Sequence, residues 1–384
     1  MRNYYFLIRP RSGHRNSELR IMNYELIERG GRLEKIDILS LSLTELENVL
    51  TELGEKKFRA KQIFQWLHVK RVTDFDKMTD ISVQLRTVLK EKFCINGLFV
   101  EKKLESCMDN TVKYLYRLSD GNFVETVLME YNYGHSICVS TQVGCKMGCR
   151  FCASAIAGYV RDLEPSEILM QIYETERDSG VRVSGVVLMG IGEPLDNYDN
   201  VVRFLSLLSD KNGNNMSLRH VSLSTCGIVP KIYDLAKLRL GVTLCVSLHC
   251  PDNEGRSKIM PVNNKYDIDS LITACKDYID ATGRRITFEY AVIDGVNSTD
   301  ADADKLADLL RGINCHVNLI PVNKVKERNY RTARSGVADF AKRLGKRGIN
   351  ATVRRTLGSD IEAACGQLRR DAAKSSEKNG GADA

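Results

Sequence analysis

The sequence lacks any long apolar run. Although 43% of its 384 residues are hydrophobic, no stretch approaches the roughly 20 apolar residues that a membrane-spanning helix needs. The basic N-terminus also has no apolar core followed by a small-residue cleavage site, so it lacks the pattern of a secretory signal peptide. We therefore expect a cytoplasmic globular protein with no membrane partner.

The chain also lacks the cysteine arrangement of a disulfide framework and a strong excess of one charge. Most of the 12 cysteines stand singly in apolar runs such as VSLSTCG and NCHVNLIP, which suits a reducing compartment. The net charge is +7 and the isoelectric point is near 8.7. This balance permits a polyanionic partner such as RNA but does not require one.

Changes in pattern along the chain divide it into six segments. Apolar residues recur at helical spacing between about residues 42 and 93, whereas alternating runs flank a turn at 119–122, as in a β-hairpin. The last residues are small and polar and offer no core. We expect a mobile basic arm (1–36) containing Met22 as a second candidate start, a helical RNA-binding accessory domain (37–95), a linker with a β-hairpin (96–135), a barrel domain (136–358), a C-terminal segment (359–370) and a disordered tail (371–384).

The helical accessory domain mixes basic and aromatic side chains. Phe58, Phe64 and Trp66 are surrounded in the sequence by lysines and arginines. The basic residues are Lys56, Lys57, Arg59, Lys61, Lys70 and Arg71. Such a mixture suits a surface that faces RNA phosphates, and a solvated basic face over an aromatic core fits it equally well.

The chain from Ser136 to Arg355 alternates seven short β-rich runs with six amphipathic helical stretches. This alternation predicts a parallel sheet with right-handed crossovers, either doubly wound or closed into a full or partial barrel. Unusual polar residues follow the predicted strands, at the edge where a β/α barrel carries its active site. They are the cysteine-rich loop, the Gly-Glu-Pro turn at 192–194, Ser224, the run Ser247, Leu248 and His249, and Asn323.

The most specific motif is a C-x3-C-x2-C run formed by Cys145, Cys149 and Cys152. Three thiolates can hold a 4Fe-4S cluster and leave one iron open to a ligand. A zinc site with an unseen fourth ligand, or three buried cysteines, would share the residues but not account for the spacing. The spacing resembles that of the radical SAM superfamily, whose members use S-adenosylmethionine (SAM), and Gly192, Glu193 and Pro194 resemble its GEP motif. A plain strand-to-helix turn is the alternative reading of this second motif.

A closer resemblance, from about Gly121 to Leu368, is to the RlmN-type RNA methyltransferases. The matching stretches are CVSTQVGCKMGCRFC, MGIGEPLDN, VSLSTCGIVP, VSLHCPD, IPVNKVKERNY and RRTLGSDIEAACGQL. The resemblance implies a radical SAM partial (β/α)6 barrel, one 4Fe-4S cluster per subunit, and SAM bound by Gly192, Glu193, Ser224, Ser247, Leu248, His249 and Asn323. It also implies methylation at C2 of an adenine in the peptidyl-transferase centre of 23S rRNA and of another beside the tRNA anticodon, at positions 2503 and 37.

The resemblance further implies a role for two cysteines outside the cluster. Cys365 would take a methyl group from one SAM, and a second SAM would be cleaved reductively to a 5′-deoxyadenosyl radical that removes hydrogen from that methyl group. The carbon radical would add to the adenine, Glu125 would accept a proton, and Cys138 would release the product by forming a disulfide with Cys365. Buried apolar thiols, and a solvated acid at a strand edge, are the alternative readings of these residues.

The resemblance implies partners as well: 23S rRNA and tRNA as substrates, and an electron donor such as flavodoxin or ferredoxin. A monomer is the simpler expectation because the partner is a large RNA. Two rival functions remain: a Cfr-like enzyme that methylates C8 of the same adenine, and a non-enzymatic, metal-containing RNA-binding factor in ribosome assembly. The second rival would need neither SAM nor Cys138 and Cys365.

Overall fold

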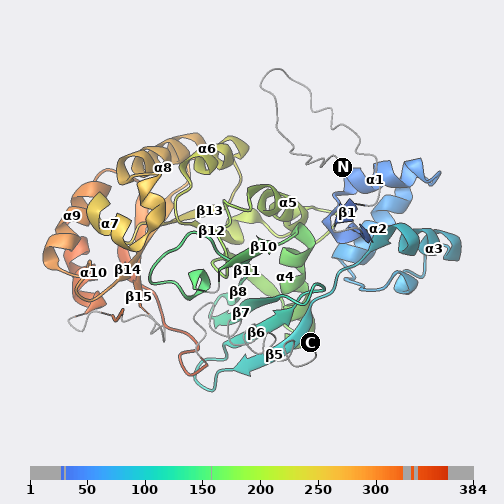
Figure 1. Cartoon of the computed structure of the whole chain (residues 1–384), viewed down its shortest axis with the longest axis horizontal. Helices are drawn as coiled ribbons and strands as arrows, with labels where there is room; N and C mark the ends of the chain where they lie inside the picture. Colours follow the sequence, from blue (N-terminus) through green and yellow to red (C-terminus); the bar gives the residue numbers. More distant parts are fainter. Residues whose placement is uncertain (1–26, 30–31, 157, 323–329, 333–335, 362–384) are drawn as a thin grey trace.

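The computed structural model describes residues 27–29, 32–156, 158–322, 330–332 and 336–361. Its centre is a ten-stranded sheet in the spatial order β16-β15-β14-β13-β12-β11-β8-β7-β6-β5 (Figure 1). The strands from β8 to β16 run parallel: β8 (Gly134–Cys138), β11 (Val183–Leu188), β12 (Val221–Thr225), β13 (Thr243–Ser247), β14 (Ile286–Val292), β15 (Cys315–Pro321) and β16 (Ala351–Val353).

Helices connect these parallel strands, so the predicted α/β partial barrel is confirmed. The connecting helices are α4 (Pro165–Ser179), α5 (Tyr198–Ser209), α6 (Val229–Leu238), α7 (Asn253–Ile259), α8 (Ile268–Thr282), α9 (Asp300–Leu310) and α10 (Val337–Lys346). Five 3-10 turns also occur in the described chain: η1 (Ile38–Ser40), η2 (Phe75–Lys77), η3 (Ala153–Ala155), η4 (Leu218–His220) and η5 (Pro261–Asn264). None of the helices described is long and apolar enough to cross a membrane.

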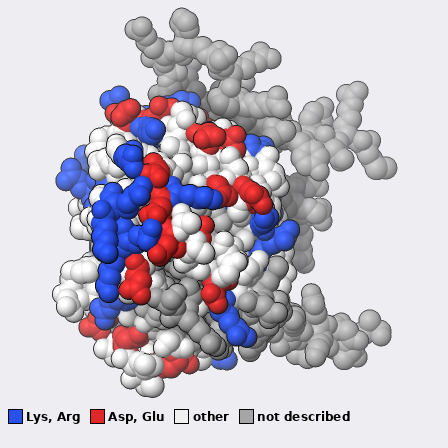
Figure 2. All heavy atoms as spheres, turned by 90° about the vertical axis from the view of Figure 1, so that its left-hand side faces the viewer, with Lys and Arg blue, Asp and Glu red and all other residues white. Residues whose placement is uncertain are grey.

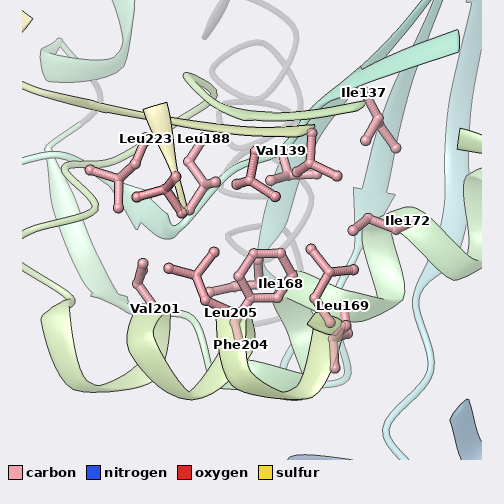
Figure 3. Packing of buried hydrophobic residues seen from close by; sticks show 14 of the residues in the cluster. Ile137, Val139, Ile168, Leu169, Ile172, Leu188, Val201, Phe204, Leu205 and Leu223 are labelled. Carbon is pink, nitrogen blue, oxygen red and sulfur yellow. The ribbon is translucent and has the colours of Figure 1, made fainter. Parts of the chain in front are cut away.

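Helix α4 shows how local sequence signals place these elements. It starts with Pro165 in its first turn, after a capping box between Glu164 and Glu167, and it ends at Gly180 in the left-handed conformation (φ 72°). Its apolar face packs with that of α5 against the buried side chains of β8, β11 and β12 (Figure 3). The main core of the barrel therefore lies between the sheet and these two helices.

Three antiparallel strands extend the sheet beyond β8. β6 (Val112–Arg117) and β7 (Phe123–Tyr131) form the predicted hairpin, and β7 pairs with β8. The third strand, β5 (Phe99–Glu105), was not predicted, because four of its seven residues are charged and it has almost no buried face. The hairpin is thus part of the barrel sheet and not a separate appendage.

The N-terminal part forms helices as predicted and packs on one end of the barrel (Figure 1). Its helices are α1 (Leu43–Glu52), α2 (Phe58–His68) and α3 (Val83–Lys92), and β3 (Ile36–Asp37) pairs with β4 (Phe93–Cys94). Within the predicted mobile arm, β1 (Ile27–Arg29) and β2 (Arg32–Glu34) form a short hairpin. Glu45 of α1 forms an ion pair with Arg203 of α5, and the hydroxyl of Tyr173 lies 3.2 Å from Nδ1 of His68.

The basic and aromatic residues of this N-terminal part do not act as one surface. Phe64 is fully buried, whereas Phe58 is 54% exposed and lies under the guanidinium of Arg59. The ammonium of Lys70 lies over the ring of Trp66, and Arg71 forms an ion pair with the buried carboxylate of Glu176. Phe64 and Arg71 are therefore structural, and Arg59 donates to Gln62 (2.9 Å) and to the carbonyl of Asp80 (3.1 Å), while Phe58 stays exposed.

Candidate active site

A cavity of about 280 Å³ opens at the C-terminal ends of the parallel strands. It brings together residues from the loop at 145–152 and from the ends of β11, β12, β13, β14 and β15. Its lining includes Cys145, Cys149, Cys152, Gly192, Glu193, Ser224, Cys226, Ser247, His249, Glu289 and Arg354, with Met147, Phe151, Met189 and Met260 as apolar walls. Most of the residues predicted to act together from their positions after strands do meet here, as the geometry of a β/α barrel requires.

The three motif cysteines lie at one end of this cavity, on the loop between β9 (Gln142–Gly144) and η3. Burial raises the pKa of the Cys145 thiol to about 12 and also raises the pKa of Cys149. Binding of iron at these thiols would therefore have to displace their protons. In the part of the chain that the structure describes, no three His, Cys, Asp or Glu side chains converge closely enough to hold a single metal ion. The C-x3-C-x2-C spacing of these thiols suits a cluster of several irons.

The turn after β11 requires glycine and carries a buried acid. A Cβ atom on Gly192 (φ 113°) would lie 2.7 Å from Cβ of Gln142, so any larger residue would displace β9. Glu193 accepts hydrogen bonds from the backbone N–H groups of Cys226 (2.7 Å) and Leu195 (3.0 Å), and burial raises the pKa of its carboxyl. Glu193 thus ties the ends of β11 and β12 together while it lines the cavity.

Ser224 and Ser247 share one acidic partner that was not predicted from the sequence. The hydroxyls of Ser224 and Ser247 donate to Oε2 of Glu289, over 2.6 Å and 3.4 Å. The other oxygen, Oε1, is buried and has no hydrogen-bond partner within the described chain. A lone acid inside the otherwise apolar strand ITFEYAV was the only sequence signal for it. Glu289 therefore offers a buried acceptor to a ligand in the cavity.

His249 is held neutral with a defined orientation. Burial lowers its pKa to about 3, and its Nδ1 accepts a hydrogen bond from the backbone N–H of Ala291 (2.9 Å). The proton of the neutral ring is therefore assigned to Nε2, which can donate. The ring of Phe151, from the cysteine loop, packs edge-on against the ring of His249, with centroids 4.7 Å apart.

Of the predicted SAM contacts, Leu248 does not line the cavity. The side chain of Leu248 belongs to the main core, its N–H donates to the carbonyl of Glu289, and its own carbonyl accepts from Nε of Arg256. Asn323 lies outside the described residues. Gly192, Glu193, Ser224, Ser247 and His249 do meet at the cavity.

Of the residues expected to act in catalysis, Cys138 lies beside the cavity, and Glu125 lies on β7, the strand that pairs with the one carrying Cys138. Cys138, at the end of β8, packs against Val127 and Met129, and Met189 contacts this group while it also lines the cavity. Glu125 is buried, and its carboxylate lies 2.9 Å from the buried ammonium of Lys113, so it is not a solvated strand-edge acid.

Cys365, the expected methyl carrier, lies outside the described residues. The cysteines that the structure describes form no disulfide with one another, so the expected bond between Cys138 and Cys365 stays a prediction. The described chain nearest to Cys365 ends at residue 361. There, the carboxylate of Asp360 accepts hydrogen bonds from the Ser106 hydroxyl (2.7 Å) and the Cys107 backbone N–H (3.0 Å).

Comparison with known proteins places this geometry in a family. Residues 36–95 match the model of the ribosomal RNA large subunit methyltransferase N-terminal domain, and residues 139–310 match that of the radical SAM superfamily. A relative from Lachnoclostridium phytofermentans, named "Probable dual-specificity RNA methyltransferase RlmN", is 54% identical over 88% of this chain and 95% of its own length. This chain belongs to the RlmN family.

Other relatives agree with this assignment. A Clostridioides difficile protein of the same name is 51% identical over 88% of this chain and 98% of its own length. The crystal structure of a radical SAM methyltransferase from Sphaerobacter thermophilus superposes with a TM-score of 0.83 at 41% identity, over 86% of this chain and 98% of that one. The predicted family and fold are thereby confirmed, and the chain is a SAM-dependent methyltransferase of the RlmN family.

Proposed function

We propose that this RlmN-family chain methylates C2 of an adenine in RNA, in both 23S rRNA and tRNA. The observation that carries the proposal is the cavity, where three cysteines face Glu193, Ser224, Ser247 and Glu289 at the strand ends of a radical SAM barrel. The names of the relatives supply the substrate class, since they describe RNA methyltransferases of dual specificity.

The cysteine loop is suited to hold a 4Fe-4S cluster through Cys145, Cys149 and Cys152. When bound, this cluster would supply the electron for reductive cleavage of SAM, delivered by a donor of the flavodoxin or ferredoxin class. The walls formed by Met147, Phe151 and Met260 would keep water from that end of the cavity. We propose a cytoplasmic monomer, as expected from the sequence.

The polar residues of the cavity would bind SAM. Glu193 would receive the amino group, because a buried carboxyl gains most from a cationic partner. Glu289 would accept hydrogen bonds from hydroxyl groups, which can reach its open Oε1. His249 would donate from Nε2 to an acceptor of the ligand. Leu248 and Asn323 remain proposed SAM contacts.

The methyl group would pass through Cys365. Its thiolate would displace the methyl group of one SAM, releasing S-adenosylhomocysteine. The S-methyl group would then lose one hydrogen atom to the 5′-deoxyadenosyl radical from a second SAM, the resulting carbon radical would add to C2 of the adenine, and the adduct would return one electron to the cluster. The thiolate of Cys138 would attack the sulfur of Cys365 to form a disulfide, while the electron pair of the broken carbon–sulfur bond passes to the methylene carbon, which takes up a proton and becomes the new methyl group. Glu125 would accept the proton from C2, with Lys113 as its counter-ion.

Two analyses of one reaction test this proposal. Anaerobically reconstituted protein is incubated with SAM, a reductant and an RNA fragment, and the nucleosides and the Cys365 peptide are examined by mass spectrometry. We expect 2-methyladenosine and S-methylated Cys365. An 8-methyladenosine product would indicate the Cfr-like reaction instead, and active enzyme with unmodified Cys365 would refute the carrier role.

A cysteine control belongs to the same experiment. Cys145→Ala, Cys149→Ala and Cys152→Ala should each abolish iron uptake and methylation. Cys315→Ala should not, because Cys315 lies at the start of β15, the opposite end of the strand from the cavity. Iron-free wild-type protein that still methylates RNA would refute the radical SAM mechanism.

A further inference from the structure

The side chain of Arg256, on α7, is completely buried behind the cavity wall. Its guanidinium donates to the carbonyl oxygens of Leu248 (3.1 Å), Ser247 (3.1 Å) and Cys226 (2.6 Å) and to Oδ1 of Asn263 (3.0 Å). All four acceptors are neutral. Among the described residues, no carboxylate forms an ion pair with Arg256.

An uncompensated buried cation is unusual because removing a charge from water costs several kcal/mol. Lys113, the other fully buried cation in the part of the chain that the structure describes, has a carboxylate at 2.9 Å. Glu193 lies on the far side of Cys226, where it accepts the N–H of that residue while Arg256 donates to its carbonyl. Cys226 therefore separates the two groups, and Glu193 makes no direct ion pair with Arg256.

The position of Arg256 points to the cysteine loop as the place where a compensating negative charge would lie. Ile259, three residues along α7, packs with Cys226, Cys250 and Met260 in the apolar group against which Met147, Cys149 and Phe151 lie. The backbone N–H of Arg150 donates to the carbonyl of Ile259 (2.9 Å). Arg256 is therefore separated from the loop that carries Cys149 by a single layer of residues.

We propose that Arg256 is a charge-compensating residue for the cluster, placed to raise its reduction potential. The inference rests on the proposed function, since it requires a cluster on the three cysteines. Three thiolates together with their iron-sulfur core carry a net negative charge that increases by one on reduction. A fixed buried cation stabilises the reduced form more than the oxidised form, and net charge and burial are among the factors that set such potentials.

A pair of variants separates charge from structure. Arg256→Gln removes the charge, while Arg256→Lys keeps a cation but loses the planar fork of donors. The readout is the midpoint potential from a redox titration monitored by electron paramagnetic resonance, together with iron content. At a fixed potential we expect the ratio of reduced to oxidised cluster to fall about tenfold in Arg256→Gln, equivalent to about 59 mV for a one-electron couple. Arg256→Lys should lie closer to wild type.

A second pair keeps Arg256 and serves if its own variants do not fold. Asn263→Asp places a carboxylate against the guanidinium, and Asn263→Leu has similar shape but no charge. Both lose the amide donor that reaches Asn253 and Ser257. Only Asn263→Asp should shift the potential to more negative values, and thermal unfolding of the iron-free proteins reports damage to the fold.

The outcomes distinguish this inference from the function on which it rests. Wild-type protein that takes up no iron-sulfur cluster would refute both. A wild-type cluster whose potential is unchanged by Arg256→Gln, or by Asn263→Asp where the first variant is unfolded, would overturn the inference alone. A potential that moves equally in Arg256→Gln and Arg256→Lys would show that hydrogen bonding, and not charge, is what matters.

Discussion

Two buried glutamates, one in the antiparallel half of the sheet and one in the parallel half, differ in how the protein satisfies their carboxylates. Glu125, on antiparallel strand β7, faces the ammonium of Lys113 at 2.9 Å. Glu289, on parallel strand β14, accepts from two serine hydroxyls and leaves Oε1 without a partner among the described residues. In the antiparallel half the charge is met within the protein, whereas in the parallel half an acceptor is left for a ligand. Equal burial therefore does not mean equal function.

On the surface of the barrel, as in the antiparallel half of the sheet, charged side chains are paired within the protein. On the face formed by α9 and α10, acidic and basic side chains lie in adjacent columns (Figure 2). Arg343 pairs with Asp300 (2.7 Å), and Arg347 pairs with Asp308 (2.5 Å). These two arginines join neighbouring helices. Exposed pairs of this kind contribute little stability.

The largest effect is expected from breaking the buried ion pair between Lys113 and Glu125. Lys113→Met leaves Glu125 buried without its cation and should lower the free energy of unfolding by about 3–5 kcal/mol. The double variant Lys113→Met/Glu125→Leu should recover most of this loss, because an apolar pair replaces the ionic one. Urea denaturation of the iron-free protein measures both. As a control, Lys103→Met removes a partly exposed lysine that pairs with Asp178 and should cost less than about 1 kcal/mol.

The carboxylate of Glu289 should affect SAM affinity strongly and the stability of the fold only slightly. Glu289→Gln should weaken SAM binding by the reconstituted protein about tenfold, or about 1.4 kcal/mol, because the acceptor for ligand donors loses its charge. The urea midpoint should change little. Isothermal titration calorimetry measures the affinity, and the exposed Glu254→Gln serves as the matched control. Unaltered SAM affinity would place the ligand away from Glu289.

Buried histidines predict how stability depends on pH. Burial lowers the pKa of both His68 and His249 to about 3, below the 6.5 of an unfolded chain. Below pH 6.5 these histidines bind protons in the unfolded state but not in the folded state. The free energy of unfolding therefore falls as the pH decreases towards 3. Each group contributes a slope of up to about 1.4 kcal/mol per pH unit.

This slope can be assigned to a residue. His68→Gln should flatten the loss of unfolding free energy between pH 6 and pH 5, whereas the exposed His220→Gln should leave it unchanged. Urea denaturation at both pH values gives the comparison. Parallel curves for wild type and His68→Gln would mean that His68 is protonated in the folded protein.

The smallest effects are expected from the two serines of the cavity that donate hydrogen bonds to Glu289. Ser224 lies 2.6 Å and Ser247 3.4 Å from the same oxygen of Glu289. Ser224→Ala should therefore reduce SAM affinity by about 1 kcal/mol, and Ser247→Ala by less, since a longer hydrogen bond is weaker. A larger loss in Ser247→Ala would show that its hydroxyl binds SAM directly and not through Glu289.

Much of this architecture could be predicted because its signals are local. The strand and helix alternation follows from hydrophobic period, and the cysteine loop is defined by the spacing of Cys145, Cys149 and Cys152. Since parallel strands end at one edge, Ser224, Ser247 and His249 could be expected at the same site. Strand β5 escaped prediction because pairing with β6, and not a buried apolar face, makes it a strand.

The sequence by itself determined the family, the order of strands and helices, and the three thiols that distinguish the site. Only the tertiary structure decided which charges would be paired. Lys113 meets Glu125 because two antiparallel strands align them, and Glu289 is left open because β12 and β13 bring their serines to one of its oxygens. Arg256 is buried behind the cysteine loop, with no carboxylate partner among the described residues. The physical reason is that residue spacing encodes local conformation, whereas the energy of a buried charge depends on its neighbours in space.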